Sequence, residues 1–193
     1  MGPMEQAAAQ LLRAIRGRRS QVAFSRRLGY RGNPVCDWEH GRSWPTAEET
    51  LRACQVVGLD VDGAFRRFAT PEIGPPKNLE QSGLAAWLRA LRGVTPVAEI
   101  AERAGVSRFV ISRWLSGTTR PRLPEFLRLL DALTRRVSEW VVGLVPIEQV
   151  PALLEDHQRR ASSRRLAAEV PWSEGIVRLL ETTDYATLPA HRP

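Results

Sequence analysis

The chain has 193 residues, which is enough for one or two compact domains and too few for a large catalytic barrel. Hydrophobic residues make up 43% of it and charged residues 25%, a globular composition, and the formal net charge is +7. The longest apolar run, residues 140–147, is too short to cross a bilayer, and the first residues lack the features of a secretory signal. We therefore expect a cytoplasmic protein without membrane spans.

Short helices separated by caps and breakers are predicted over the first part of the chain. In chain order they cover residues 5–16, 21–28, 34–40, 46–57 and 61–68. Ser20 and Asn33 stand at expected N-cap positions, and Gly29 separates the second helix from the third. Residues 69–81 are rich in proline and glycine, which stop helix and strand alike, so a linker is predicted there.

The same pattern then starts again. Helices are predicted over residues 84–92, 96–104 after a Thr95 cap, 108–115 after a Ser107 cap, 124–133 and 137–145. Residues 146–193 differ, because a long helix over 147–170 is predicted to end at Pro171 and to be followed by a short helix over 172–182. No stretch alternates with period two over the length of a strand, so the predicted fold is all-α.

An internal repeat relates these two helix sets. Shifting the chain by 76 residues places Leu12-Arg13-Ala14-Ile15-Arg16-Gly17 on Leu88-Arg89-Ala90-Leu91-Arg92-Gly93. The same shift aligns Gly29 with Gly105, Trp38 with Trp114, Gly41 with Gly117 and Pro45 with Pro121. Chance does not keep one offset across such residues, so we predict two copies of one small domain. We call residues 5–68 the first repeat and residues 82–145 the second repeat; residues 146–193 form a C-terminal helical extension.

Charge and cysteines narrow the possible roles. Residues 1–78 and 79–145 each carry a net charge of +4, and Lys77 is the only lysine, so the basic side chains are almost all arginine. Arginine suits phosphates and guanine edges, although a basic balance also fits solubility or a membrane surface. The two cysteines, Cys36 and Cys54, are too few for a disulfide framework, and no His or Cys pair has zinc-ligand spacing. We expect reduced thiols and no metal site.

The second repeat resembles the Cro-like, lambda-repressor-like helix-turn-helix family, also called XRE, through the run from Ile100 to Gly117 and the following Pro121. The first repeat resembles it through Ser20-Gln21, the run from Phe24 to Gly29, Val35, the run from Trp38 to Gly41, and Pro45. The resemblance implies tandem five-helix domains and a bacterial, nucleoid-associated protein that binds double-stranded DNA. Ala101 and Gly105 are expected to let two helices approach closely, and Ile111 and Trp114 to anchor the second of them.

The resemblance also implies which side chains face DNA. Base reading falls to the helix over 108–115, where Arg108 and Arg113 suit bidentate contacts to guanine and Phe109 suits a thymine methyl group. The full base-reading set is Ser107, Arg108, Phe109, Ser112 and Arg113. Phosphate contacts are assigned to Ser20, Gln21, Arg26, Arg27, Arg31 and Arg42 in the first repeat, and to Thr118, Thr119, Arg120 and Arg122 in the second. The alternative is that Arg108 and Arg113 are simply solvated surface arginines.

The first repeat departs from the family pattern on its own recognition helix. Its equivalents of Arg108, Phe109, Val110, Ser112 and Arg113 are Gly32, Asn33, Pro34, Cys36 and Asp37. Phosphate repels a carboxylate in the groove unless the carboxylate accepts a hydrogen from a cytosine amino group. We therefore expect the first repeat to hold the DNA backbone while the second reads sequence, with a protein contact as the alternative for the first repeat.

The remaining expectations concern core and function. Burial is predicted for Trp38, Trp87, Trp114, Trp140 and Cys54. Cys36 is the thiol expected to be exposed, and a redox role is considered for it. No phosphate-binding loop, nucleophile elbow or carboxylate pair appears, so neither enzymatic activity nor a cofactor is expected.

The expected function is transcriptional regulation by sequence-specific DNA binding. The rivals are an adaptor or antitoxin-like module that docks on a protein partner, and nonspecific nucleoid binding. The C-terminal extension is expected to pack on the second repeat or to pair with a second chain as a homodimer. Alternatively, Pro171-Trp172-Ser173-Glu174 and the residues after it resemble the start of an uncharacterised region of bacterial regulator-like proteins, reduced here to a stub.

Overall fold

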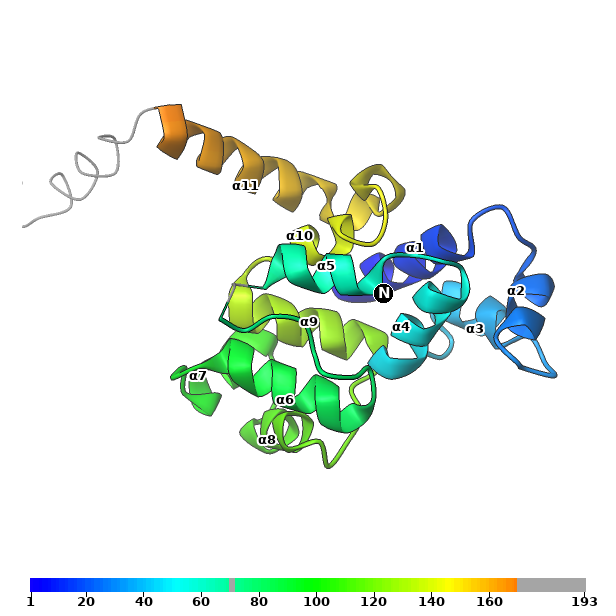
Figure 1. Ribbon diagram of the computed structural model, residues 1–193, viewed down its shortest axis with the longest axis horizontal. Helices are drawn as coiled ribbons and strands as arrows, with labels where there is room; N and C mark the ends of the chain where they lie inside the picture. Colours follow the sequence, from blue (N-terminus) through cyan, green and yellow to red (C-terminus); the bar gives the residue numbers. More distant parts are fainter. Residues whose placement is uncertain (70–71, 170–193) are drawn as a thin grey trace, which may run out of the picture. The chain divides into compact units, whose positions relative to one another are not determined.

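The computed structural model describes residues 1–69 and 72–169, and every regular element in these ranges is helical (Figure 1). The all-α prediction is therefore confirmed. The first repeat contains α1 (Pro3–Arg16), α2 (Gln21–Arg27), α3 (Pro34–Glu39), α4 (Ala47–Val56) and α5 (Val61–Phe68). The second contains α6 (Gln81–Arg92), α7 (Val97–Ala104), α8 (Arg108–Ser116), α9 (Leu123–Thr134) and α10 (Val137–Val142). A 3₁₀ turn, η1 (Ile147–Gln149), precedes α11 (Pro151–Glu169). The predicted helix over 172–182, Pro171 and the proposed stub lie outside the described residues.

Two of the four expected N-caps form as predicted. The hydroxyl of Ser20 accepts a hydrogen bond from Ala23 N at 3.2 Å, and that of Ser107 accepts one from Val110 N at 3.4 Å. The Thr95 cap is wrong, because α7 starts one residue later and Pro96 occupies the cap position. Asn33 stands at the N-cap of α3 but makes no capping hydrogen bond, since its Oδ1 instead accepts from the Ser25 hydroxyl at 3.0 Å.

The turn between α7 and α8 depends on the conformation of Gly105. This residue has φ +64° and ψ +33°, the left-handed region in which a side chain is strained. A Cβ atom placed on Gly105 would meet nothing within 4 Å, so the expectation that this glycine permits a close helix approach is wrong. Glycine is required there by the backbone turn, while the neighbouring small residue Ala101 is buried.

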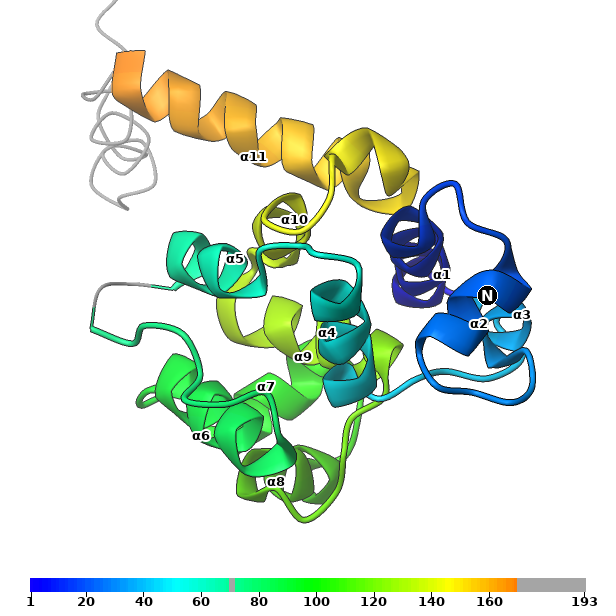
Figure 2. The same ribbon diagram turned by 45° about the vertical axis from the view of Figure 1, so that its right-hand side comes forward.

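Residues 1–154 form one compact unit in which helices of the two repeats pack on each other. Helix α1 packs on α9, and α5 packs on α10 (Figure 2). Aromatic side chains share one core: the ring centroid of Phe65 in α5 lies 4.7 Å from that of Trp87 in α6 and 6.1 Å from that of Trp140 in α10. The burial predicted for four tryptophans and one cysteine is confirmed for Trp38, Trp87, Trp114, Trp140 and Cys54. The division into two separate domains stays a prediction.

Arginines that recur in the two repeats make the same hydrogen bonds. Arg13 donates to the carbonyl oxygen of Glu39 at 2.6 Å, and its equivalent Arg89 donates to the carbonyl oxygen of Leu115 at 2.5 Å. Each bond ties the first helix of a repeat to the end of the third. Arg16 and its equivalent Arg92 form the second recurring pair. Arg16 donates to the carbonyl oxygen of Arg19, and Arg92 donates to that of Thr95, so each ties the end of its helix to the following loop. The repeated Leu-Arg-Ala-x-Arg-Gly pattern thus has a structural cause.

The first residues of the C-terminal extension belong to the compact unit. The predicted helix over 147–170 is interrupted, because η1 ends at Gln149 and the next residue, Val150, has φ −127° and ψ +66°, which are not helical. Val150 and Leu153 are buried, and Ala152 N donates to Gln10 Oε1 at 2.9 Å. Within the second unit, residues 155–193, the described residues are helical and carry the ion pairs Arg159–Glu155 and Arg160–Asp156. Among the described helices, none is long and apolar enough to span a bilayer.

Candidate nucleic-acid interface

Helices α7 and α8 form a compact pair whose inner face is apolar. Ile100 of α7 and Ile111 of α8 are fully buried, and Trp114 and Leu115 are nearly so. The anchoring role predicted for Ile111 and Trp114 is confirmed. With this face fixed to the core, the opposite face of α8 must point away from it, because residues three and four apart share one side of a helix.

The outward face of α8 carries the five residues predicted to read bases, Ser107, Arg108, Phe109, Ser112 and Arg113, and all five are exposed. We call them the base-reading face. Phe109 is 80% exposed, an unusual state for a large apolar ring and one typical of a contact surface. Within the described part of the chain, the guanidinium groups of Arg108 and Arg113 have no hydrogen-bond or ion-pair partner. Their donors are therefore available to an external acceptor.

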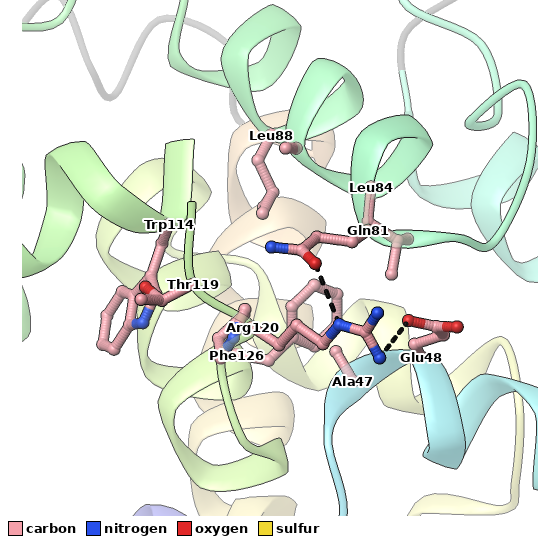
Figure 3. Close-up of a pocket in the computed structure, with 11 residues that line it drawn as sticks. Ala47, Glu48, Gln81, Leu84, Leu88, Trp114, Thr119, Arg120 and Phe126 are labelled. Atoms are coloured by element: carbon pink, nitrogen blue, oxygen red, sulfur yellow. Dashed lines mark hydrogen bonds and ion pairs between the residues drawn. The ribbon is translucent and has the colours of Figure 1, made fainter. Parts of the chain in front are cut away.

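The loop after α8 holds the four predicted phosphate contacts of the second repeat. Thr118 is exposed, and its hydroxyl lies 2.7 Å from that of Ser116. Arg120 donates to Gln81 Oε1 at 2.9 Å and forms an ion pair with Glu48 at 3.4 Å (Figure 3). The Arg122 guanidinium donates to the carbonyl oxygen of Trp44. Thr119, the fourth residue, is half-buried. The two arginines of this loop are thus bonded to other parts of the protein, which reduces their freedom to bind phosphate.

A cavity lies beside this loop, between the two repeats (Figure 3). Its apolar lining includes Leu84 and Leu88 of α6, Trp114 of α8 and Phe126 of α9. Glu48 of α4 stands at its edge, where one carboxylate oxygen is buried and faces Arg120. The void has a volume of about 20 Å³, close to that of a single water molecule, so it is a packing defect rather than a ligand pocket.

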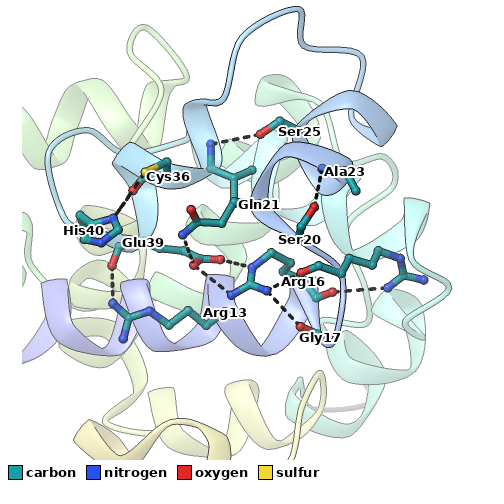
Figure 4. A network of polar contacts seen from close by, with 12 residues as sticks. Arg13, Arg16, Gly17, Ser20, Gln21, Ala23, Ser25, Cys36, Glu39 and His40 are labelled. Atoms are coloured by element: carbon teal, nitrogen blue, oxygen red, sulfur yellow. Dashed lines mark hydrogen bonds and ion pairs between the residues drawn. The ribbon is translucent and has the colours of Figure 1, made fainter.

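In the first repeat, a buried carboxylate organises the corresponding region. Glu39, at the end of α3, is 2% exposed and accepts hydrogen bonds from Arg16 at 2.5 and 3.1 Å (Figure 4). It also accepts one from the side-chain amide of Gln21 at 2.7 Å. Sequence reasoning assigned Gln21 to phosphate and did not identify this network. The repeat alignment contained a signal for it, because Glu39 aligns with Leu115, an apolar residue. A carboxylate at a position that is apolar in the other repeat indicates a buried charge, and Leu115 is indeed buried.

The other predicted phosphate contacts of the first repeat fall into two groups. Arg26 and Arg31 are exposed and have no partner within the described residues, whereas Arg27 donates to Val56 O at 3.0 Å. Arg42 is also bonded, donating to Asp37 Oδ1 at 2.7 Å. Ser20 is exposed, and its hydroxyl caps α2.

The face of α3 has a different chemistry from that of α8. Asp37 and Arg42 form an ion pair, and Arg42 also donates to the Cys36 sulfur at 3.4 Å. The hydrogen bond to Asp37, followed by the one to Cys36, raises the pKa of the Arg42 guanidinium, so this group stays charged. The expected exposure of Cys36 is partial, and its sulfur lies 3.7 Å from His40 Nδ1. An arginine that neutralises the carboxylate leaves α3 with no free charge for base reading.

Comparison with protein families agrees with the geometry of the second repeat. Residues 86–140 match a family described as helix-turn-helix, and the match covers α7, α8 and α9 together with most of α6 and α10. This part of the chain is therefore similar to helix-turn-helix domains. Neither the curated proteins nor the solved structures give a match to the chain.

Proposed function

We propose that the chain is a sequence-specific DNA-binding protein that regulates transcription, with α8 placed in the major groove. The observation that carries the proposal is the base-reading face of α8, on which Arg108 and Arg113 are exposed and have no partner among the described residues, beside the exposed Phe109 ring. Unused guanidinium donors on a helix that is anchored on its opposite side suit the width and chemistry of a major groove.

Each residue of the base-reading face has a role in this proposal. Arg108 and Arg113 each donate two hydrogen bonds to a guanine edge, and Phe109 contacts a thymine methyl group. Ser107 and Ser112 accept or donate at whichever base lies opposite. The role requires no cofactor and no reaction, and it places the protein in the cytoplasm at the nucleoid.

Backbone contacts come mainly from the arginines that have no internal partner. Of the arginines predicted to contact phosphate in the first repeat, Arg26 and Arg31 have no partner among the described residues. Thr118 and Thr119 supply hydroxyl donors after α8, and Ser20 supplies one before α2. Phosphate contacts of this kind set register and affinity, and carry no direct sequence information.

The test is a selection of bound sequences from a random double-stranded library, performed at two salt concentrations. A motif recovered at both is expected, because base contacts survive salt that weakens phosphate contacts. Binding that is blind to sequence and vanishes as salt rises would exclude base reading by α8.

A second candidate function is docking of the first repeat on a protein partner, as in an adaptor or antitoxin-like module. It is favoured by the Asp37–Arg42 pair, which leaves the α3 face without free cations, and by Gln21, whose amide is already bonded to Glu39. Charge reversal at the pair, Asp37→Arg with Arg42→Asp, distinguishes the two functions. It should leave the selected DNA motif unchanged and abolish binding to a protein partner.

A further inference from the structure

We infer that one chain is an internal pseudo-dimer that occupies a single, one-sided DNA site: α8 reads the sequence of one half-site, and the first repeat holds only the backbone of the adjacent half-site. This inference rests on the proposed DNA binding. It adds the number of chains in the complex, the symmetry of the site and the division of labour between the repeats.

The first observation is that Thr46 meets its own equivalent. Thr46 and Arg122 are 76 residues apart, the offset of the repeat, and they pair as an antiparallel bridge. Its two hydrogen bonds are reciprocal: Ala47 N donates to Pro121 O at 3.0 Å, and Leu123 N donates to Pro45 O at 2.8 Å. The two donors are equivalent residues of the two repeats, and so are the two acceptors, so exchanging the repeats turns one bond into the other. Equivalent residues meet in this way only where a two-fold axis passes between them.

The second observation lies at the far end of the same interface. The Arg67 guanidinium of α5 donates to the carbonyl oxygen of Gly143, which is also 76 residues away. Helix α5 packs on α10, its equivalent, and a Cβ atom on Gly143 would lie only 2.9 Å from the Cβ of Ala64. Two separate contacts between equivalent positions therefore define one pseudo-two-fold axis through the 1–154 unit.

Both recognition helices lie at the end of the axis marked by Thr46 and Arg122. Short loops, residues 40–46 and 117–122, join α3 and α8 to that bridge, while α5 and α10 lie at the opposite end (Figures 1 and 2). A two-fold axis presents equivalent helices to the same side, so α3 and α8 can face one DNA duplex. In dimeric helix-turn-helix proteins, such helices meet half-sites about one helical turn, or 10 base pairs, apart.

The chemistry of the two helices breaks this symmetry. The base-reading face of α8 has free arginines, whereas α3 carries Asp37 bonded to Arg42. Arg26 and Arg31 of the first repeat have no partner among the described residues, and they suit phosphate because they lie outside α3, on α2 and in the following turn. The interface between the repeats is moreover already filled by packed side chains such as Phe65 and Trp140, so a second chain has no equivalent face to pair with.

The test uses the full chain and duplexes built on the selected motif. One duplex contains the motif alone. The others extend it by about 10 base pairs on one side or on the other, and each extension is made in two versions of unrelated sequence. We expect extension on one side to raise affinity about ten-fold whatever its sequence, and extension on the other side to change it little. Native mass spectrometry should give one chain per duplex.

Several results would overturn the inference. They are two chains per duplex, a motif that is an inverted repeat with both halves equally selective, or an equal gain from the two extensions. Failure of the proposed function is distinguishable from these, because then no motif is recovered at all and the duplex series cannot be built.

Paired variants separate backbone holding from general charge. Arg26→Ala should remove most of the gain from the one-sided extension. Arg66→Ala is the matched control, because Arg66 is also exposed but lies on α5, at the other end of the axis. It should keep the full gain. Equal losses for the two variants would show that net charge, rather than a placed first repeat, causes the effect.

Discussion

Arg16 and the buried Glu39 form a partly buried ion pair, with Arg16 Nε 2.5 Å from Glu39 Oε1, that joins α1 to the end of α3. The equivalent positions in the second repeat hold Arg92 and Leu115, and there the arginine keeps its bond to the following loop, to Thr95 O, without an ion pair. The same helix contact is therefore made with a buried carboxylate in one repeat and with an apolar side chain in the other.

Glu39→Ala should lower the free energy of unfolding by about 2 kcal/mol, because it leaves the partly buried Arg16 and Gln21 without their acceptor. Urea unfolding followed by circular dichroism measures the change. The control copies the second repeat: Glu39→Leu with Gln21→Val reproduces Leu115 and Val97, and should lose much less. If the two variants lose equally, the network does not contribute through its charges.

Arg108→Ala and Arg113→Ala should each weaken binding to the selected motif by about 1–3 kcal/mol, the range for a bidentate contact to guanine. Binding to unrelated duplex should change far less, because these arginines are proposed to bind base edges. Competition titrations with both duplexes give the ratio. Equal losses on specific and unrelated DNA would exclude base reading by these residues.

Arg26→Ala should reduce the slope of log affinity against log salt by about 0.9, the value for one phosphate contact, without altering the selected motif. Arg27 is less suitable for this test because its guanidinium is bonded to Val56 O, so its removal also affects folding. Titrations at several salt concentrations give the slope. A slope that stays at the wild-type value would place Arg26 away from the DNA backbone.

Gly143→Ala should destabilise the protein by about 1–3 kcal/mol, because the added methyl group would lie 2.9 Å from the Cβ of Ala64 at the α5–α10 contact. Strain in the backbone plays no part, since Gly143 has φ −64°. Gly32→Ala is the matched control: its Cβ would have nothing within 4 Å, and stability should change by less than about 0.5 kcal/mol. Chemical denaturation of both variants makes the comparison, and a neutral Gly143→Ala would mean that α5 and α10 are not in close contact.

Burial raises the pKa of the Cys54 thiol from 9.0 to about 12, so this group stays neutral in the folded protein where the unfolded chain would ionise it. Burial of the neutral Cys54 thiol contributes fully to the stability of the folded protein below pH 9, and this contribution is lost as pH rises toward 12. Between these values the stability of the wild type should fall by up to about 1.4 kcal/mol per pH unit more than that of Cys54→Ala. Unfolding measured at several alkaline pH values tests this, and parallel curves would contradict it.

Labelling provides an independent check on the same residue. A thiol reagent at neutral pH should modify the partly exposed Cys36 in the native protein and reach Cys54 only after unfolding.

The sequence by itself determined the helices, most of their boundaries and the apolar face of α8, because period, caps and breakers act over a few residues. Ser20 and Ser107 are caps as predicted, and Trp38 and Trp114 are buried as their equal repeat positions indicated. The role of Gly105 was misjudged, since a glycine in a turn pattern does not reveal whether conformation or close approach requires it.

Which polar side chains are free was decided only by the tertiary structure. Arg122 and Trp44 are 78 residues apart, and Gln21 and Glu39 are 18 apart, so nothing local foretells that these pairs meet. The bridge between Thr46 and Arg122 depends in the same way on how the repeats pack. A repeat in sequence establishes that two helix sets are alike. Their arrangement about an axis follows from the side chains that fill the space between them, and that information is distributed over the whole chain.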